Sequence, residues 1–165
     1  MKLGDGVEQS IHAVALLSGL QGGAVLPAAS IAEFLGSSVS YLLKHLQAMS
    51  REGILESVPG PKGGYRLGRT AEKISLLDIV LSVEGPRPAF RCSEIRQRGP
   101  NQLPKGLYLQ PCTISVAMLR AERVYRAELA KTTVAEITTQ WLAQGEGVIA
   151  ARSCTFLEIN KRSQT

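Results

Sequence analysis

Six consecutive residues, Pro59-Gly60-Pro61-Lys62-Gly63-Gly64, restrict the fold of this chain more than any other segment. Proline fixes its own backbone angle, and glycine adopts conformations that are costly for other residues, so this hexapeptide fits only a tight loop. The flanking residues 54–58 and 65–67 are short and apolar enough to form strands. The sequence therefore predicts a small β-hairpin at this point.

Three helices are predicted before the hairpin. Apolar side chains recur at helical spacing in residues 7–18, 27–35 and 39–52. Gly36 suits the end of the second helix, and Ser37 or Ser38 suits the cap of the third, so the turn between them is short. Helix, short turn, helix and hairpin in this order form a winged helix–turn–helix, whose last helix enters the major groove of DNA.

Candidate DNA contacts lie on the third helix and on the hairpin. Hydroxyl groups near the start of the helix are placed to reach base edges, and cations one turn later or on the wing are placed to reach phosphates or a minor groove. A protein-binding module of similar elements is the alternative. The candidate residues are Ser38, Ser40, Tyr41, Lys44, His45, Lys62 and Arg66.

The second half of the chain has a different character. A helix over residues 76–83 is followed by a long loop, rich in Pro and Gly, that Cys92 and Cys112 bracket. Helices are then expected over residues 113–130 and 134–142. The predicted fold is mainly α with a small β-hairpin. It divides into a winged domain (1–84), a loop (85–112), two further helices (113–144) and a poorly ordered tail (145–165).

Composition and motifs exclude several classes of protein for this sequence. No apolar run approaches the ~20 residues that span a bilayer, and Met1-Lys2-Leu3 is followed by Gly-Asp-Gly rather than by the apolar segment of a signal peptide. The three cysteines do not suit a disulfide framework, because one would be left over. No phosphate-binding loop or nucleophile motif is present, so an enzyme is not expected. We therefore expect a cytoplasmic protein without membrane association.

Four stretches of the chain match a known family. They are Met1-Lys2-Leu3, Ser38-Val39-Ser40-Tyr41-Leu42, Gly60-Pro61-Lys62-Gly63-Gly64-Tyr65-Arg66-Leu67 and Ile74-Ser75-Leu76-Leu77-Asp78-Ile79-Val80. Over residues 1–142 the chain resembles the IscR/NsrR-type bacterial regulators, the Rrf2 family. The resemblance implies a homodimeric transcription factor that reads a pseudo-palindromic operator in double-stranded DNA.

The same resemblance implies that residues 113–130 form the dimerisation helix, with Met118 and Val124 at the interface. The apolar side chains of this helix are, by themselves, equally compatible with packing inside one subunit. Many members of the family also carry an iron–sulfur cluster in the preceding loop. These relatives usually have three loop cysteines, whereas here Tyr108 stands where the middle one is expected.

A cluster needs four ligands, and the loop offers only Cys92 and Cys112. Glu8 and His12 are four residues apart and share one face of the first helix, from which the family can supply a ligand across the dimer. The resemblance therefore implies a 2Fe–2S cluster held by Cys92, Cys112, Glu8 and His12. Such a cluster would sense redox state or nitric oxide.

Each of these residues also has a structural interpretation. A carboxylate in a first helical turn is favoured by the helix dipole, and cysteines are often small core residues. Cys154, in the predicted tail, is an alternative ligand. The alternative function is a cluster-free winged-helix regulator that is controlled by a partner protein, a small ligand or a thiol switch between Cys92 and Cys112.

Overall fold

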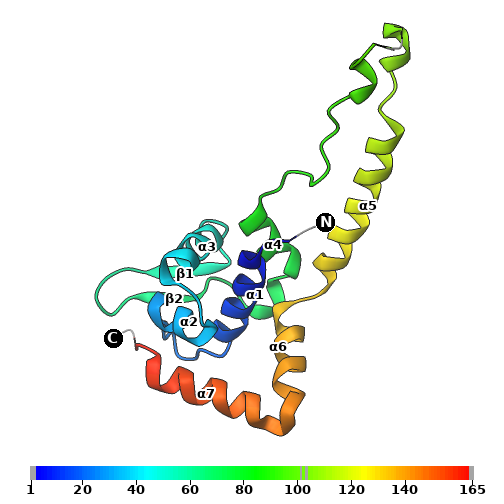
Figure 1. Ribbon diagram of the computed structural model, residues 1–165. Coiled ribbons are helices and arrows are strands. Elements are labelled where there is room, and N and C mark those ends of the chain that lie inside the picture. Colours follow the sequence, from blue (N-terminus) through cyan, green and yellow to red (C-terminus); the bar gives the residue numbers. More distant parts are fainter. Residues whose placement is uncertain (1–2, 101, 103, 164–165) are drawn as a thin grey trace.

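The structure is a computed structural model that describes residues 3–100, 102 and 104–163. It is mainly helical and contains a two-stranded antiparallel hairpin, which confirms the predicted fold class (Figure 1). The elements are α1 (Asp5–Leu17), α2 (Ala28–Leu35), α3 (Val39–Arg51), β1 (Leu55–Val58), β2 (Gly64–Leu67), η1 (Ala71–Lys73), α4 (Leu76–Glu84), η2 (Ile95–Gln97), η3 (Lys105–Tyr108), α5 (Thr113–Lys131), α6 (Val134–Ala143), η4 (Gln144–Gly147) and α7 (Val148–Asn160).

The turn between α2 and α3 has the chemistry that the sequence predicts. Gly36 ends α2 in the left-handed region, at φ 61° and ψ 32°, which glycine adopts without steric cost. Ser38 then caps α3, because its hydroxyl accepts a hydrogen bond from the Tyr41 backbone N–H at 3.3 Å. The two helices are therefore joined by a short turn, as the helix–turn–helix motif requires.

The hairpin is fixed to the rest of the fold through β2. Its register pairs Leu55 with Leu67 and Val58 with Gly64. Tyr65 exchanges two backbone hydrogen bonds of 2.9 Å with Leu26, which precedes α2. A Cβ atom on Gly64 would lie 2.5 Å from the Leu26 carbonyl oxygen, so this close approach requires glycine. The wing is thus held against the helices by its own backbone.

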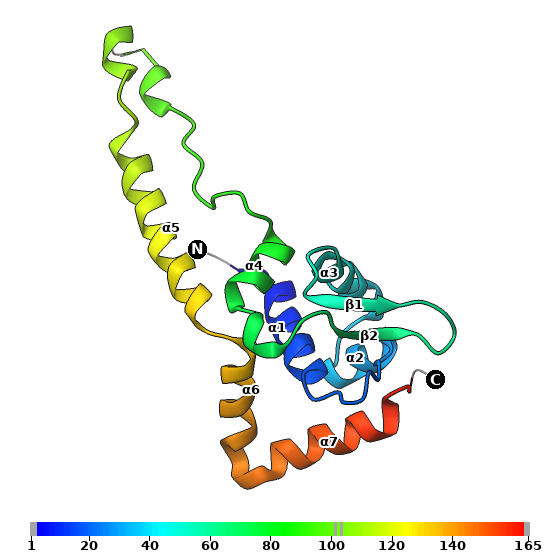
Figure 2. The ribbon, with the colours of Figure 1, turned by 180° about the vertical axis from the view of Figure 1, so that it is seen from behind.

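One hydrophobic core unites both ends of the chain. Fully buried side chains from α1 to α4 and the hairpin meet at its centre, including Leu16, Leu17, Leu42, Leu46, Met49, Ile54 and Ile79. Val134 of α6 and Leu157 of α7 belong to the same cluster. Residues 3–84 and 132–163 therefore form one unit, which we call the body, and α6 is part of it (Figure 2).

The prediction of a poorly ordered tail over residues 145–165 is wrong, because residues 148–160 form α7. Ser153 and Leu157 of this helix are buried, and the ring of Phe156 lies 5.0 Å from that of Phe34. Beyond the helix, Arg162 pairs with Val25 in an isolated antiparallel bridge. Only a narrow side of α7 contacts the body, so its sequence lacks the strong periodicity that marks a more deeply buried helix.

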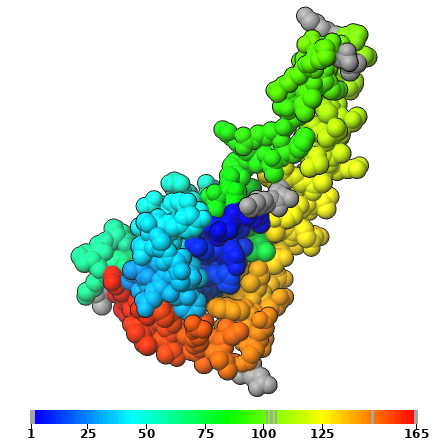
Figure 3. All heavy atoms as spheres, viewed as in Figure 1, coloured from blue at the N-terminus to red at the C-terminus, as the bar shows by residue number. Residues whose placement is uncertain are grey.

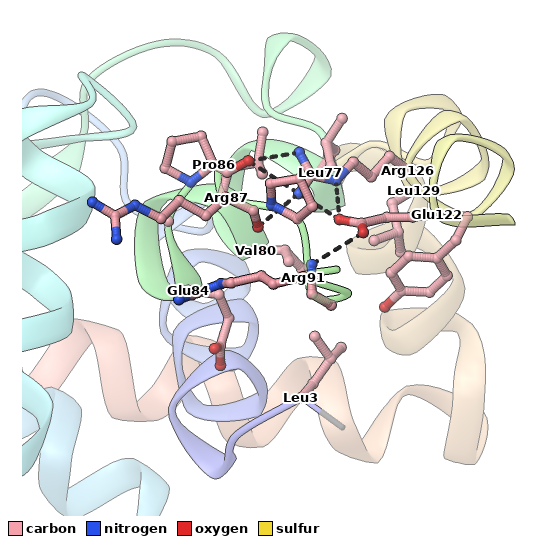
Figure 4. A pocket seen from close by; sticks show the side chains of 15 residues that line it. Leu3, Leu77, Val80, Glu84, Pro86, Arg87, Arg91, Glu122, Arg126 and Leu129 are labelled. Carbon is pink, nitrogen blue, oxygen red and sulfur yellow. Dashed lines mark hydrogen bonds and ion pairs between the residues drawn. The ribbon is translucent and has the colours of Figure 1, made fainter. Parts of the chain in front are cut away.

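The described residues of 85–131 form an arm that projects from the body, with the loop running beside α5 (Figures 1 and 3). Glu122 anchors the base of the arm. Its carboxylate accepts hydrogen bonds from the Ala89 N–H at 3.0 Å and from Arg126 at 2.6 Å, and Arg126 also donates to the Pro86 carbonyl. A cavity of about 340 Å³ lies beside these groups (Figure 4).

None of the helices described here is long and apolar enough to cross a lipid bilayer.

Candidate functional site

The first turns of α3 present an exposed polar surface. Ser38, Ser40, Tyr41 and Lys44 are all exposed, as the sequence predicts for residues that contact DNA. The hydroxyls of Ser38 and Ser40 lie 2.9 Å apart, and the Lys44 ammonium lies 4.1 Å from the centre of the Tyr41 ring. Hydroxyl groups can read base edges, and the ammonium can bind a phosphate.

His45 does not lie on this surface, contrary to the prediction. Its side chain is buried, with 8% exposure, against the first turns of α1. Burial lowers the pKa of the imidazole, and the neighbouring Lys44 lowers it further. The reason is helical geometry. Position 45 follows the buried Leu42 by three residues and precedes the buried Met49 by four, so all three share the inner face.

The two predicted wing residues differ in their surroundings. Lys62 is exposed in the loop of the hairpin. Arg66 instead donates two hydrogen bonds, of 2.9 and 2.8 Å, to the carboxylate of its cross-strand partner Glu56, and a third, of 2.8 Å, to the Gly23 carbonyl. The Arg66 hydrogen bonds lower the pKa of Glu56. Arg66 therefore ties the wing to the segment that follows α1.

Cys92 and Cys112 come together in the arm, and Glu94 joins them. One ligand atom from each of these three residues lies within 4.8 Å of the others. Backbone N–H groups of Ser115 and Ile114 at the start of α5, the Cys92 side chain and the Arg96 guanidinium lower the pKa of the Cys112 thiol. Two thiols and a carboxylate are donors that suit iron–sulfur chemistry or zinc.

Glu94 is a candidate ligand that our sequence analysis did not select. The signal was present as the short Cys92-Ser93-Glu94 spacing. Glu94 has a left-handed backbone, at φ 49°, an uncommon conformation for a residue other than glycine. Arg96 donates to its carboxylate and lowers its pKa. The Tyr108 hydroxyl donates to the Arg96 carbonyl at 2.6 Å, which joins the two limbs of the loop.

Glu8 and His12 lie elsewhere in the subunit. Both are exposed on α1, where the His12 ring meets that of Trp141 edge-on at 6.4 Å. Helix α1 belongs to the body, whereas α5 begins well out along the arm and runs back toward the body (Figure 1). One subunit therefore does not bring the four predicted ligands together.

The helix predicted to mediate dimerisation exposes many apolar side chains. Met118 and Val124 are 44% and 67% exposed. Further exposed apolar side chains on α5 are Ile114, Val116 and Leu119. Within α5, all of which is described, Glu122 is the one buried residue.

A family model described as "Rrf2: Iron-dependent Transcriptional regulator" matches residues 3–140. Met1 and Lys2, which open the first matching stretch named above, lie outside the residues that the structure describes. Among curated relatives, YffB of Lactococcus lactis subsp. lactis is 34% identical over 97 residues, 59% of this chain and 62% of that protein. The HTH-type transcriptional regulator IscR of Photorhabdus laumondii is 37% identical over 67 residues, 41% of each chain. The matches thus span roughly half the length of these curated relatives.

Solved structures support the same fold. CymR, described as the global cysteine regulator of B. subtilis, aligns with a TM-score of 0.65 at 20% identity, over 85% of this chain and 98% of CymR. IscR of T. potens aligns with a TM-score of 0.62 at 20% identity, over 88% and 95% of the two chains. Since the family model covers most of the chain and the winged helix–turn–helix is complete, the protein belongs to the Rrf2 family of DNA-binding transcription regulators, which are not enzymes.

Proposed function

We propose that the protein is a homodimeric regulator that senses redox state or nitric oxide through a 2Fe–2S cluster. Cys92 and Cys112 of one subunit and Glu8 and His12 of its partner would hold the cluster. The dimer would bind a pseudo-palindromic operator, because a two-fold axis presents two copies of α3 to two half-sites.

The observation that carries this proposal is the separation of the donors. The two thiols meet in the arm beside the start of α5, whereas Glu8 and His12 are exposed on the body. An arm that exposes apolar side chains and extends away from its own body is suited to reach the body of a second subunit. Such an arrangement would complete two sites per dimer.

The residues fit the chemistry of the proposed group. Thiolates are the usual ligands of iron–sulfur clusters, and imidazole can replace them, as in Rieske centres. When bound, a 2Fe–2S cluster supplies reversible one-electron chemistry. Arg96 lies near both thiols and would balance part of their negative charge. His12 would bind through a deprotonated ring nitrogen, so acid should weaken its hold on the metal.

Anaerobic purification with cluster-assembly support tests the proposal. We expect a red-brown protein that contains iron and labile sulfide. Cys92→Ala and Cys112→Ala should abolish iron binding, whereas Cys154→Ala, at an exposed position on α7, is the matched control. A colourless, iron-free wild-type protein would overturn the proposal.

Subunit mixing tests where the ligands come from. A Cys92→Ala/Cys112→Ala subunit paired with a Glu8→Ala/His12→Ala subunit should regain one site per heterodimer. Absence of this rescue, together with iron loss in Glu94→Gln, would instead place the ligands within one arm.

A thiol switch is the second candidate, and one observation favours it. The Cys92 and Cys112 sulfur atoms lie within 4.8 Å of each other, and the Cys92 side chain helps to lower the pKa of the Cys112 thiol. Oxidation of an iron-free protein would then join them in a disulfide, with two electrons and two protons passing to the oxidant. Mass spectrometry of the oxidised protein before and after reduction distinguishes this candidate from the cluster.

A further inference from the structure

His45 is a buried polar residue that neither the core nor the DNA surface explains. Its imidazole packs directly on the backbone of α1, because a Cβ atom built on Gly6 would lie 2.5 Å from both Cε1 and Nε2. Among the described residues, Nε2 has no hydrogen-bond partner. A leucine or methionine would fill such a place without leaving a buried polar atom unsatisfied, so the imidazole calls for a separate explanation.

The imidazole also contacts the proposed DNA-reading surface. The rings of His45 and Tyr41 lie 5.1 Å apart in an edge-on arrangement, and Tyr41 in turn lies beneath the Lys44 ammonium. His45 thus stands between the first turn of α1 and the exposed residues of α3. A movement of Gly6 toward α3 would displace the imidazole and with it the Tyr41 ring.

The first turn of α1 is also tied to the end of α4, where the arm departs from the body. The Gly4 N–H donates to the Glu84 carboxylate at 3.1 Å, and Glu84 is the last residue of α4. Gly85, with φ 84°, then begins the loop that leads to Cys92. Glu8, a proposed ligand, lies in the same stretch of α1. The start of α1 therefore contacts the reading helix and the end of α4, from which the arm departs, and it carries the proposed ligand Glu8.

We infer that His45 is a positioning residue that sets the orientation of Tyr41 according to the position of the first turn of α1. This inference rests on the proposed function, because loading the metal site through Glu8 and His12 is what would fix that turn. Loaded and cluster-free protein would then present Tyr41 differently to DNA. Coupling between two sites requires such an element with two arrangements.

The test compares operator affinity with and without the cluster. The DNA probe is a duplex selected by wild-type protein from a random pool, and the reconstituted and iron-free dimers are each titrated with it. We expect wild-type affinities that differ about tenfold, a typical coupling between two sites. His45→Gln, which keeps a polar side chain but no ring, and Gly6→Ala, which displaces the ring, should bring this ratio close to one. Iron content and dimer mass should stay unchanged.

A matched control and a double variant distinguish a lost affinity ratio from a general loss of stability. Gly19→Ala places a Cβ 2.8 Å from Leu157 rather than from α3, so it should destabilise the body but preserve the affinity ratio. Gly6→Ala/His45→Ala removes the clash and should melt at a higher temperature than Gly6→Ala alone, without regaining the ratio. Strictly additive melting temperatures would contradict the direct contact.

The outcomes separate the two proposals. In one outcome, the affinity ratio of the wild type differs clearly from one, and both His45→Gln and Gly6→Ala keep the same ratio. That result overturns the role of His45 and leaves the cluster proposal intact. Wild-type protein that loads no iron overturns the cluster proposal. In that case, the selected duplexes are ranked by their affinity for wild type and for His45→Gln. The same order for both proteins would also overturn the positioning of Tyr41.

Discussion

The body and the arm of this protein differ in how far they bury their apolar side chains. The body buries large apolar residues from both ends of the chain in one core. The arm buries little, and apolar side chains such as Leu109 and Ile95 are 84% and 74% exposed. The body therefore buries its apolar side chains within a single chain, whereas the arm leaves exposed the apolar surface that the proposed dimer would cover.

This difference indicates which properties of the protein each region controls. The body holds its candidate DNA-contacting residues in place through caps, backbone hydrogen bonds and close packing, none of which needs a second chain. The arm holds two thiols and a carboxylate near one another but leaves them exposed or half-buried. Changes in the arm should alter assembly and metal binding, and changes in the body should alter stability and DNA binding.

The largest effect is expected from a charge placed among the exposed apolar side chains of the arm. Val124→Asp should convert dimers into monomers and remove specific operator binding, because a buried unpaired carboxylate is costly. Sedimentation velocity and operator titration measure the two effects. Ala151→Asp, the same charge at an exposed position on α7, is the control. Dimers of unchanged affinity from Val124→Asp would contradict the assignment.

Truncating one leucine in each region tests the difference in burial. Leu17→Ala, at a position with 1% exposure, should lower the free energy of unfolding by about 2–5 kcal/mol. Leu109→Ala, at 84% exposure, should change it by less than about 0.5 kcal/mol. Urea denaturation measures both variants. Similar losses from both would show that the arm is as tightly packed as the body.

Lys62→Ala tests whether the wing acts through phosphates. The variant should bind all duplexes more weakly and reduce the salt dependence of binding by roughly one counterion per subunit. Its dimer mass and iron content should match wild type, because the wing belongs to the body. A loss confined to one DNA sequence would show that Lys62 reads bases instead.

Glu56→Gln should have the smallest effect. Because Arg66 lowers the pKa of Glu56 from its ordinary value of 4.5, their ion pair stabilises the fold above that pH and ceases to do so as pH falls. The variant should therefore melt slightly below wild type at pH 7, and the two should converge in acid. It should also bind DNA slightly more tightly, since Arg66 loses its anionic partner. Parallel melting curves at every pH would contradict this role of the pair.

Local chemistry explains why the helices of the body could be predicted so closely. Gly36, Ser38 and Ser75 mark helix ends by hydrogen bonds to neighbouring residues, and such contacts depend on nearby sequence alone. Helix α7 was missed because its few buried or partly buried side chains contact residues more than a hundred positions earlier, as Phe156 contacts Phe34. Long-range packing of this kind leaves only a weak pattern in the sequence.

The candidate site shows the same limit. Spacing predicted that Cys92 and Cys112 bracket one loop, but the approach of Glu94 depends on a left-handed backbone that its sequence does not favour. Likewise, the placement of His45 depends on which face of α3 meets α1. A helical period identifies the residues that share a face, and only packing decides where polar members of that face point.

The bond between Arg162 and the wing has a consequence for how the chain folds during synthesis. The Arg162 side chain donates to the Pro61 carbonyl at 2.6 Å, and its backbone exchanges two hydrogen bonds with Val25. The wing therefore gains its last support only after the whole arm has left the ribosome. A nascent chain would hold an unfinished DNA-binding domain while its thiols are already exposed to the cell. Under the proposed function, iron loading and dimer assembly would begin before the wing is fully supported for DNA binding.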